Sequence, residues 1–446
     1  MVSARTCASD LATPSHPSPS TAPDVLRKER FGALWYRRSD CSTEAIPPGP
    51  AILLASSTQE SILTQYARQG GVPGLDDQAF SLLVASWRRE GMLDAGFRCT
   101  AQVVDTPRTH PALTAPLVTH VELTRACNLR CAHCYMDVVA SPARDELPAA
   151  RWSELFAELK QLGAPLLVLA GGEPLLRPDL ERVLDGLAQH QLDAWLCTNA
   201  TLVDETRARQ LAASPLRGYS ISLDGPDAES HDRLRGRGQF DRAMRGIAHL
   251  IAAGAHDVKL RVTVTPAVAN RLLEFAPLAT RLGVHRVVFK PFSQLGEASA
   301  AHDLVVPRRH WQRVVKRVRD AWPETSCPAD LSDGIPTRAP AWLGVSPGFG
   351  CIAGTTTATV THDGRVLGCG SLRPDNAWSL HHHTLTECWA ESPAVTMWRQ
   401  LEPGASCAAC DDLVTCAGAC RARAMASGGI RGRDPWMGCA GEHASG

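Results

Sequence analysis

The sequence predicts an α/β protein whose largest part is a partial (β/α)6 barrel of the TIM type. The first observation behind this fold class is that short apolar segments alternate with amphipathic segments between residues 117 and 325. Such alternation favours parallel strands joined by right-handed crossovers. The second observation is that residues 24–100 and 351–446 follow other patterns. They predict a winged-helix-like domain before the barrel and a small cysteine-rich domain after it.

The six barrel strands are expected at short apolar or alternating segments, which are 118–124, 165–171, 193–199, 218–225, 258–265 and 286–292. The helices between them are expected where apolar residues recur at a period near 3.6, which are the segments 149–163, 179–191, 205–214, 239–254 and 272–283.

Several expected strands carry polar residues on one face. In the segment 258–265, Lys259, Arg261 and Thr263 alternate with apolar residues. Strands covered by helices on both faces are normally apolar throughout. A buried polar face is costly unless it lines a wet or ligand-filled cavity, so we expect a barrel with a polar interior. An antiparallel sheet with one solvated face is the alternative, and the alternating helices disfavour it.

The N-terminal domain is expected to contain a strand at 30–38 and helices at 58–69 and 76–93. Three further segments are rich in proline and small or polar residues, and they predict a disordered tail at 1–23, a linker at 101–116 and a connecting loop at 326–350.

Composition excludes several classes of partner. The 46 lysines and arginines balance the 46 aspartates and glutamates, so nucleic acid is not an expected ligand. No apolar run approaches the roughly 18 residues of a membrane helix, and no secretory h-region opens the chain, which predicts a cytoplasmic protein without a membrane partner. In that reducing compartment, 16 cysteines indicate metal binding or redox chemistry more than disulfides.

Three cysteines lie within eight residues, directly after the first barrel strand. Cys127, Cys131 and Cys134 have the spacing C-x3-C-x2-C, and Tyr135 follows the last of them. An odd number of thiols disfavours disulfides, and structural zinc usually takes four ligands. Three thiolates can hold three irons of a 4Fe–4S cluster and leave the fourth iron open. The sequence here resembles the radical S-adenosylmethionine (SAM) superfamily, whose cluster loop has this spacing.

The resemblance implies that the open iron binds SAM and that reductive cleavage gives a 5′-deoxyadenosyl radical. Further motifs of the family occur in the expected order, in the segments 170–174, 197–202 and 220–225. The resemblance implies that the SAM-binding residues are Tyr135, Gly171, Gly172, Glu173, Thr198, Asn199, Ser222 and Arg261. For the last four of these residues, the alternative role is to line the barrel with polar groups without contacting SAM.

The C-terminal cysteines resemble the SPASM domain of radical SAM peptide-modifying enzymes, on the patterns C-x12-G-x4-C and C-x2-C-x5-C-x3-C. The resemblance implies two auxiliary 4Fe–4S clusters, so three clusters in all. Auxiliary cluster I would take Cys351, Cys369 and Cys420, and auxiliary cluster II would take Cys407, Cys410, Cys416 and Cys439. A zinc knuckle over 407–420 is the alternative.

One departure from the sulfatase-maturing relatives concerns auxiliary cluster I. These relatives have an eighth cysteine soon after the first, and this chain has none between Cys351 and Cys369. The fourth ligand is therefore open, and a substrate thiolate is one candidate. Cys327 and Cys388 are possible substitutes outside the usual position.

Residues 24–100 resemble, more weakly, the peptide-recognition domains of the PqqD type. Such domains bind a leader peptide as an added strand, so the resemblance implies a precursor peptide with a leader as partner. A DNA-binding winged helix, or a domain that merely covers the barrel, is the alternative. The family also implies an electron donor such as flavodoxin or ferredoxin.

Together these features predict a radical SAM enzyme that abstracts hydrogen from a ribosomally made precursor peptide and forms a thioether or a carbon–carbon crosslink. A peptide epimerase, with Cys197 as hydrogen donor, an oxidative decarboxylase and a sulfatase-type maturase are the enzymatic alternatives. An iron–sulfur regulator without turnover is the alternative from another class.

Overall fold

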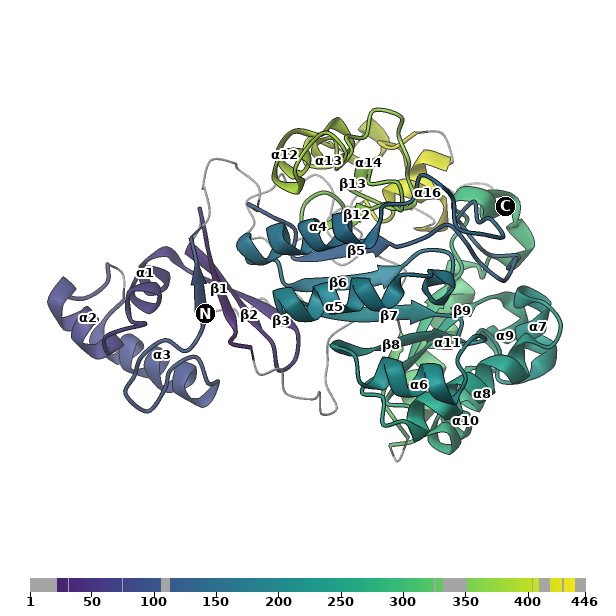
Figure 1. The fold of residues 1–446 in the computed structure, drawn as a ribbon, viewed down its shortest axis with the longest axis horizontal. Helices are drawn as coiled ribbons and strands as arrows, with labels where there is room; N and C mark the ends of the chain where they lie inside the picture. Colours follow the sequence, from purple (N-terminus) through teal and green to yellow (C-terminus); the bar gives the residue numbers. More distant parts are fainter. Residues whose placement is uncertain are drawn as a thin grey trace.

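The computed structural model describes residues 22–30, 32–73, 75–105, 113–324, 326–331, 351–402, 404–408, 418–426 and 429–437. Most of the expected tail, the middle of the expected linker and most of the connecting loop lie outside these ranges. Figure 1 shows the N-terminal domain at one end, the barrel next to it, and the C-terminal segments over one side of the barrel.

The main sheet confirms the six expected strands and their parallel pairing. They follow one another in chain order across the sheet. Their bounds are β5 (Val118–Glu122), β6 (Leu166–Ala170), β7 (Asp193–Thr198), β8 (Leu216–Ser222), β9 (Val258–Val264) and β10 (Arg286–Pro291).

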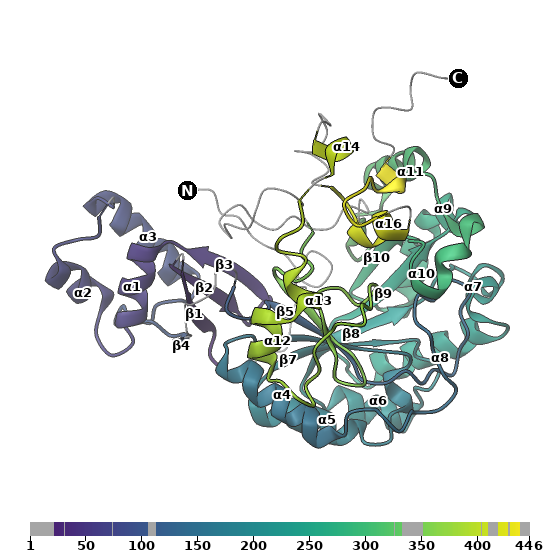
Figure 2. The same ribbon diagram turned by 90° about the horizontal axis from the view of Figure 1, so that it is seen from above.

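The five expected crossover helices are also present, and Figure 2 shows α4, α5, α6 and α8 along the outer rim of the curved sheet. Leu169, Leu196 and Leu260 point from the strands into the core beneath them, and Trp152 of α4 is fully buried there. The crossover helices are α4 (Ala149–Gln161), α5 (Leu180–His190), α6 (Glu205–Ala212), α8 (Gln239–Ala252) and α10 (Phe275–Leu282), with α7 (Ala228–Arg235), α9 (Pro266–Ala269) and α11 (Arg308–Ala321) in addition.

The sheet has three more strands than expected, because three strands from outside residues 117–325 join it. β11 (Ala329–Leu331) pairs with β10, and β12 (Thr357–Val360) pairs in parallel with β5. β13 (Val366–Leu367) then pairs antiparallel with β12. A strand of two to four residues within a cysteine-rich segment has no periodic signal, so the sequence pattern did not reveal these additions.

The C-terminal segments otherwise form short helices over the β12 edge of the sheet (Figure 1). They are α12 (Leu385–Glu391), α13 (Pro393–Thr396), α14 (Ala405–Ala408) and α16 (Arg421–Ala426). A Thr384 capping box with Glu387 starts α12, and the backbone N–H groups of Leu385 and Thr386 donate to Glu158 of α4.

The N-terminal domain is a four-stranded sheet with three helices. The expected strand and two helices are confirmed as β2 (Gly32–Arg37), α2 (Ile62–Gln69) and α3 (Asp77–Arg89). The structure adds β1 (Val25–Glu29), β3 (Ser42–Ile46), α1 (Pro48–Ser56) and β4 (Gln102–Val104), and the strand order is β3-β2-β1-β4.

Both faces of this N-terminal sheet are covered. Leu26 and Trp35 pack against the helices, whereas Val25 and Tyr36 pack against the starts of the barrel strands, next to Trp195 of β7. Figure 1 shows the sheet between its own helices and the barrel. The domain therefore covers the end of the barrel at which the strands begin.

A buried ionic group fastens the two domains. Arg38 pairs with Asp193 at 2.5 Å, and both side chains are almost completely buried. The Tyr36 hydroxyl donates to the same carboxylate at 3.0 Å, and Arg217 donates to the Arg38 carbonyl at 2.6 Å. Among the described residues, no helix is both long and apolar enough to cross a membrane.

Candidate active site

The three clustered cysteines lie on one loop, immediately beyond the end of β5. Cys127, Cys131 and Cys134 are all half-buried free thiols. The Cys127 N–H donates to the Val139 carbonyl at 2.8 Å, and the Cys134 N–H donates to the Cys131 carbonyl at 3.1 Å. These backbone bonds hold the loop as a defined turn at the carboxyl ends of the strands, where barrel enzymes place their chemistry.

The surroundings of the thiols fit an iron–sulfur cluster. Burial raises the pKa of Cys127, and it raises the pKa of Cys131 to about 11 although Arg235 opposes the shift. Thiolates at neutral pH therefore require a bound metal. Two donors already face the sulfurs: the Leu129 N–H lies 3.4 Å from Cys127 Sγ, and Arg235 lies 3.7 Å from Cys131 Sγ. Such donors stabilise the negative charge of a ligated cluster.

A buried carboxylate, to which the sequence motifs assigned no role, orients the Arg235 guanidinium. Asp224, two residues beyond the end of β8, is completely buried and receives the Arg235 Nε–H at 2.5 Å and the Thr263 N–H at 2.7 Å. His133 of the cysteine loop lies 3.3 Å from the same carboxylate. Burial alone would raise the pKa of Asp224, but Arg235 and His133 lower it to about 2.

The expected glycines bring the end of β6 against the cysteine loop. A Cβ on Gly172 would lie 2.2 Å from the Ala126 carbonyl oxygen, and one on Gly171 would lie 2.4 Å from the Thr124 carbonyl oxygen. Gly171 also has φ +132°, a conformation that favours glycine. The backbone bond from the Glu173 N–H to the Ala126 carbonyl, at 2.7 Å, depends on this close approach.

Glu173 joins the two motifs that follow β6 and β7. Its carboxylate is buried and accepts the Thr198 hydroxyl at 2.7 Å and the Asn199 N–H at 2.8 Å. Burial raises its pKa, and these donors oppose the shift. The Leu175 N–H adds a third bond at 3.2 Å. Glu173 therefore fixes the position of Thr198 and Asn199, whatever else it contacts.

Asn199 is in turn bonded to the cysteine loop through a residue that sequence reasoning missed. Its Nδ2 donates to Oδ1 of Asn128 at 3.0 Å, and Asn128 Nδ2 donates to the Thr201 hydroxyl at 2.9 Å. Asn128 follows Cys127 directly, so the available signal was a polar amide inside the cysteine motif. The loop, the β6 end and the β7 end thus form one bonded unit.

Ser222 and Arg261 occupy paired positions of β8 and β9, so their side chains emerge side by side from the sheet. Both are half-buried. The register of the sheet places His120 of β5 and Cys197 of β7 on the same face as Ser222 and Arg261. Burial lowers the pKa of His120 to about 4 and raises that of Cys197, and Arg261 lowers the pKa of both groups. The expected polar lining is therefore present on four strands.

Tyr135 lies between the cysteine loop and the C-terminal segments. Tyr135 as a whole is 38% exposed, but desolvation at its hydroxyl raises the pKa of that group, with Glu122 as the largest electrostatic contribution. Glu122 itself is buried and receives Arg373 at 2.7 and 2.9 Å. The Tyr135 carbonyl accepts the Glu297 N–H at 3.2 Å, so this part of its main chain is already occupied.

Three of the seven C-terminal cysteines, namely Cys351, Cys369 and Cys420, lie near one another in the part of the chain that the structure describes. Burial raises the pKa of Cys351 to about 12, with further increases from the neighbouring thiols of Cys369 and Cys420. The Cys420 N–H donates to Asp434 at 2.8 Å. Cys407 is buried and its thiol contacts the Gly432 carbonyl at 3.7 Å. Cys410, Cys416 and Cys439 lie outside the described residues.

The two possible substitute ligands differ in position. Cys388 of α12 is completely buried in the main hydrophobic core beside Trp389, so it does not face a cluster. Cys327 is half-buried and packs at the edge of that core, where its carbonyl accepts the Trp322 indole N–H at 2.9 Å. Neither thiol belongs to the Cys351 group as the structure stands.

Comparison with known proteins gives consistent results. Residues 121–274 match the sequence profile of the radical SAM superfamily. The chain is 30% identical over 333 residues to the mycofactocin maturase MftC of Mycolicibacterium smegmatis, covering 72% of this chain and 83% of the relative. It is 29% identical over 323 residues to the AdoMet-dependent heme synthase of Nitratidesulfovibrio vulgaris, covering 68% of this chain and 86% of the relative.

The fold is similar to that of Streptococcus suis SuiB in the crystal structure with its precursor peptide SuiA. The TM-score is 0.73 at 16% identity, over 96% of this chain and 98% of the other. Coverage this high includes the N-terminal domain as well as the barrel.

Proposed function

Because the chain belongs to the radical SAM superfamily of enzymes, we propose that it modifies a ribosomally made precursor peptide. The observation that carries the proposal is the bonded unit of cysteine loop, β6 end and β7 end at the mouth of a barrel with a polar lining. The N-terminal domain, shared with a protein crystallised with a precursor peptide, supports a peptide as the substrate class.

The residues present fit the cofactors. Cys127, Cys131 and Cys134 would hold a 4Fe–4S cluster, and SAM bound to it supplies a 5′-deoxyadenosyl radical for hydrogen abstraction. Arg235 places positive charge beside the cluster, and Glu173 keeps the backbone of the β6 and β7 ends in position.

Further polar residues would contact SAM or the substrate. We assign Thr198 and Asn199 to the ribose or the carboxylate of SAM, with Ser222 and Arg261 beside them. The main chain at Tyr135 would face the adenine with groups other than the Tyr135 carbonyl, which accepts the Glu297 N–H. The cationic Arg261, half-buried on the face that also carries His120 and Cys197, suits a carboxylate.

We assign auxiliary cluster I to Cys351, Cys369 and Cys420, and auxiliary cluster II to Cys407, Cys410, Cys416 and Cys439. The mutual effect of the first three thiols on the pKa of Cys351 supports the first assignment. Because Cys388 is buried in the core, a fourth ligand from the substrate remains available. We therefore favour a thioether from a peptide cysteine over a carbon–carbon crosslink.

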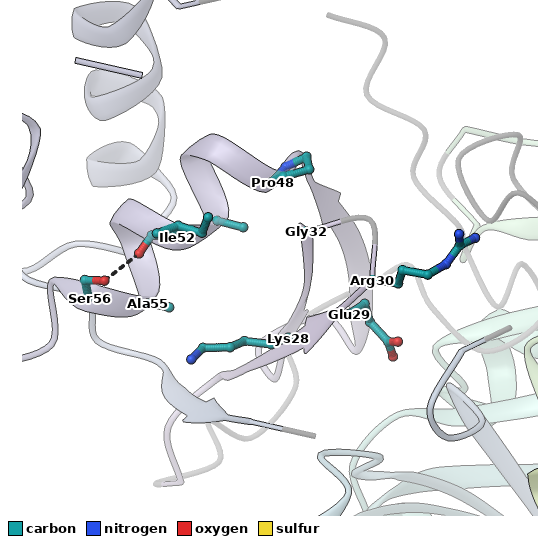
Figure 3. A pocket seen from close by; sticks show the side chains of 9 residues that line it. Lys28, Glu29, Arg30, Gly32, Pro48, Ile52, Ala55 and Ser56 are labelled. Carbon is teal, nitrogen blue, oxygen red and sulfur yellow. Dashed lines mark hydrogen bonds between the residues drawn. The ribbon is translucent and has the colours of Figure 1, made fainter. Parts of the chain in front are cut away.

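The N-terminal domain is proposed to bind the leader peptide in the manner of a PqqD-type domain. A cavity of about 260 Å³ lies between the end of β1 and α1. In Figure 3, the Lys28 and Ile52 side chains border this space, whereas Glu29 and Arg30 point away from it. The volume suits one apolar side chain of a bound peptide, next to the aliphatic part of Lys28.

We place the enzyme in the cytoplasm, with a flavodoxin or ferredoxin as electron donor. The support for a reducing compartment is that ten of the chain's 16 cysteines fall in the two proposed cluster motifs.

Co-expression with the short peptides encoded beside the gene tests the proposal. We expect one of them to lose two hydrogen atoms per crosslink, as read by mass spectrometry, and Cys131→Ala to abolish the loss. An unchanged mass with D-residues would indicate the epimerase. Loss of carbon dioxide would indicate the decarboxylase, and unchanged peptides throughout would refute peptide modification.

Heme synthesis is the second candidate, because a relative of similar identity has that name. The test is complementation of a strain that lacks its own AdoMet-dependent heme synthase. Restored heme formation would favour this function over peptide modification.

A further inference from the structure

A group of metal-ligating side chains lies outside the cysteine sites, where the segment leaving the cysteine loop meets the turn between β12 and β13. A ring nitrogen of His362 and one carboxylate oxygen each of Asp145 and Asp363 lie within 4.8 Å of one another. No other group of this kind was found among the described residues. None of these three side chains belongs to the cysteine motifs or has a role in the proposed chemistry.

The histidine provides a second, independent indication of a ligand. His362 is 5% exposed, and its Nδ1 is buried without a hydrogen-bond partner among the residues that the structure describes. A buried polar atom without a partner is costly, and native structures usually satisfy such atoms. A metal ion is one group that satisfies an imidazole nitrogen between two carboxylates.

The backbone around the three side chains is held in place without a metal. The Leu147 N–H donates to the His362 carbonyl at 2.7 Å, which joins the two segments directly. Glu146 accepts the Thr124 hydroxyl at 2.6 Å and the Arg125 N–H at 3.0 Å. Asp145 therefore belongs to an anchored segment, although its own side chain is exposed.

The turn that carries the other two ligands is equally fixed. The Thr361 N–H donates to the Arg365 carbonyl at 2.9 Å, and the Gly364 N–H donates to the Thr361 carbonyl at 2.8 Å. Asp363 accepts the Thr361 hydroxyl and lies 3.4 Å from Arg365. Arg365 partly neutralises the charge of Asp363, whereas Asp145 has no ion-pair partner within the described part of the chain.

We propose that Asp145, His362 and Asp363 bind a first-row divalent cation, with Mn2+ or Zn2+ as the fitting class. One imidazole and two carboxylates, without a thiolate, form a ligand set that suits these ions and leaves positions for water. The cation joins the segment that follows the cysteine loop to the β12–β13 turn. That turn lies between Cys351 and Cys369 in the sequence, and β12 lies alongside β5 (Figure 1).

The consequence is a clamp between the cysteine loop and the C-terminal domain. The Val139 N–H donates to the Arg125 carbonyl at 3.0 Å, and the Val139 carbonyl accepts the Cys127 N–H. Backbone bonds already hold both ends of the segment from Cys127 to Asp145, and the bound cation adds a side-chain link from Asp145 to the β12–β13 turn. Binding energy that is specific to the folded state stabilises this arrangement.

The test uses the anaerobically reconstituted full-length holoenzyme, incubated with Mn2+ and desalted. Total manganese and zinc per chain are then counted by mass spectrometry, and bound Mn2+ is observed by electron paramagnetic resonance. We expect one equivalent of manganese or zinc in the wild type, and only traces in Asp145→Asn and His362→Asn with unchanged iron. Asp185→Asn, on the exposed side of α5, is the matched control and retains the equivalent.

Limited trypsin digestion provides a readout of the clamp itself, because Arg144 is exposed next to Asp145. Mn2+ should slow cleavage after Arg144 several-fold in the wild type and in Asp185→Asn, and it should have no effect in the two site variants. A wild type that holds no more manganese or zinc than Asp145→Asn overturns the proposal. Since Asp145 is exposed, that variant retains its fold, and unchanged iron content verifies this.

Discussion

The Arg235 guanidinium donates to Asp224 at 2.5 Å and to Cys131 Sγ at 3.7 Å, so a buried carboxylate orients the cation that faces the cysteine loop. Asp224 lies two residues beyond the end of β8, and Arg235 is the last residue of α7. The pair therefore connects the rigid sheet to the proposed SAM cluster. Replacing Arg235 and replacing Asp224 should therefore have different effects on the protein.

Replacing Arg235 with glutamine removes a cationic donor from a ligating sulfur. The reduced cluster, which has the larger negative charge, loses more stabilisation than the oxidised one. We expect the midpoint potential to fall by about 30–60 mV, where about 59 mV corresponds to a tenfold change for one electron. A redox titration followed by electron paramagnetic resonance measures the shift. Arg233→Gln, whose side chain is exposed on the same helix, should leave the potential unchanged.

Replacing Asp224 with asparagine should make stability depend less on pH. The pKa of Asp224 is about 2 in the folded chain and near 3.8 ordinarily, so the ionised group stabilises the fold above about pH 4. This contribution is lost as the pH falls towards 2, and it amounts to roughly 2–3 kcal/mol. Urea unfolding of the cluster-free chain should therefore show a wild-type advantage at pH 6 that shrinks at pH 3. A wild-type stability advantage that is equal at pH 6 and pH 3 would contradict a stabilising role of the ionised Asp224 carboxylate.

Replacing Asp193 with asparagine should loosen the N-terminal domain. Arg38 and the neighbouring Arg217 would remain near the interface without their carboxylate, and breaking a buried pair in this way costs about 3–5 kcal/mol. Denaturant unfolding followed by fluorescence measures the loss. Asp320→Asn breaks the exposed pair with Lys316, which water screens, and should cost far less stability than Asp193→Asn. Equal losses in both variants would contradict the role of the buried group.

Replacing Gly172 with alanine should reduce the iron content of the SAM cluster. The new Cβ would lie 2.2 Å from the Ala126 carbonyl, so the cysteine loop must move away from the end of β6. Iron and sulfide analysis after reconstitution measures the effect. Gly70→Ala meets no atom within 4 Å and serves as the control, with strain of about 1 kcal/mol from its φ of +70° but full iron content.

The barrel could be predicted from sequence because each strand and crossover helix has a local period. β5 to β10 and their five helices all appear within a few residues of the expected bounds. β11 to β13 could not be predicted, because such short strands are specified by pairing with a neighbour and not by their own pattern. For the N-terminal domain, the sequence left contact with the barrel as only one of the alternatives, because a local pattern does not show which surface a strand packs against. Apolar residues on both faces of β2 do not reveal which surface covers the second face.

For the candidate site, sequence motifs identified the residues next to the cysteine loop but not those that position them. Gly171, Gly172 and Glu173 do contact the loop or its neighbours, as their order in the chain indicated. Asp224 and Arg235 lie about 100 residues from Cys131, so only the fold brings them together. His362 had even less signal, because a single histidine in a turn has no motif.

The most direct test of the central claim follows hydrogen from peptide to cofactor. A candidate precursor peptide made with deuterated amino acids is incubated anaerobically with the reconstituted enzyme, SAM and a reductant, and 5′-deoxyadenosine is analysed by mass spectrometry. Our account predicts that 5′-deoxyadenosine gains deuterium with wild-type enzyme and that Cys131→Ala forms none. Formation of 5′-deoxyadenosine without deuterium, from every encoded peptide tested, would contradict a peptide as the substrate.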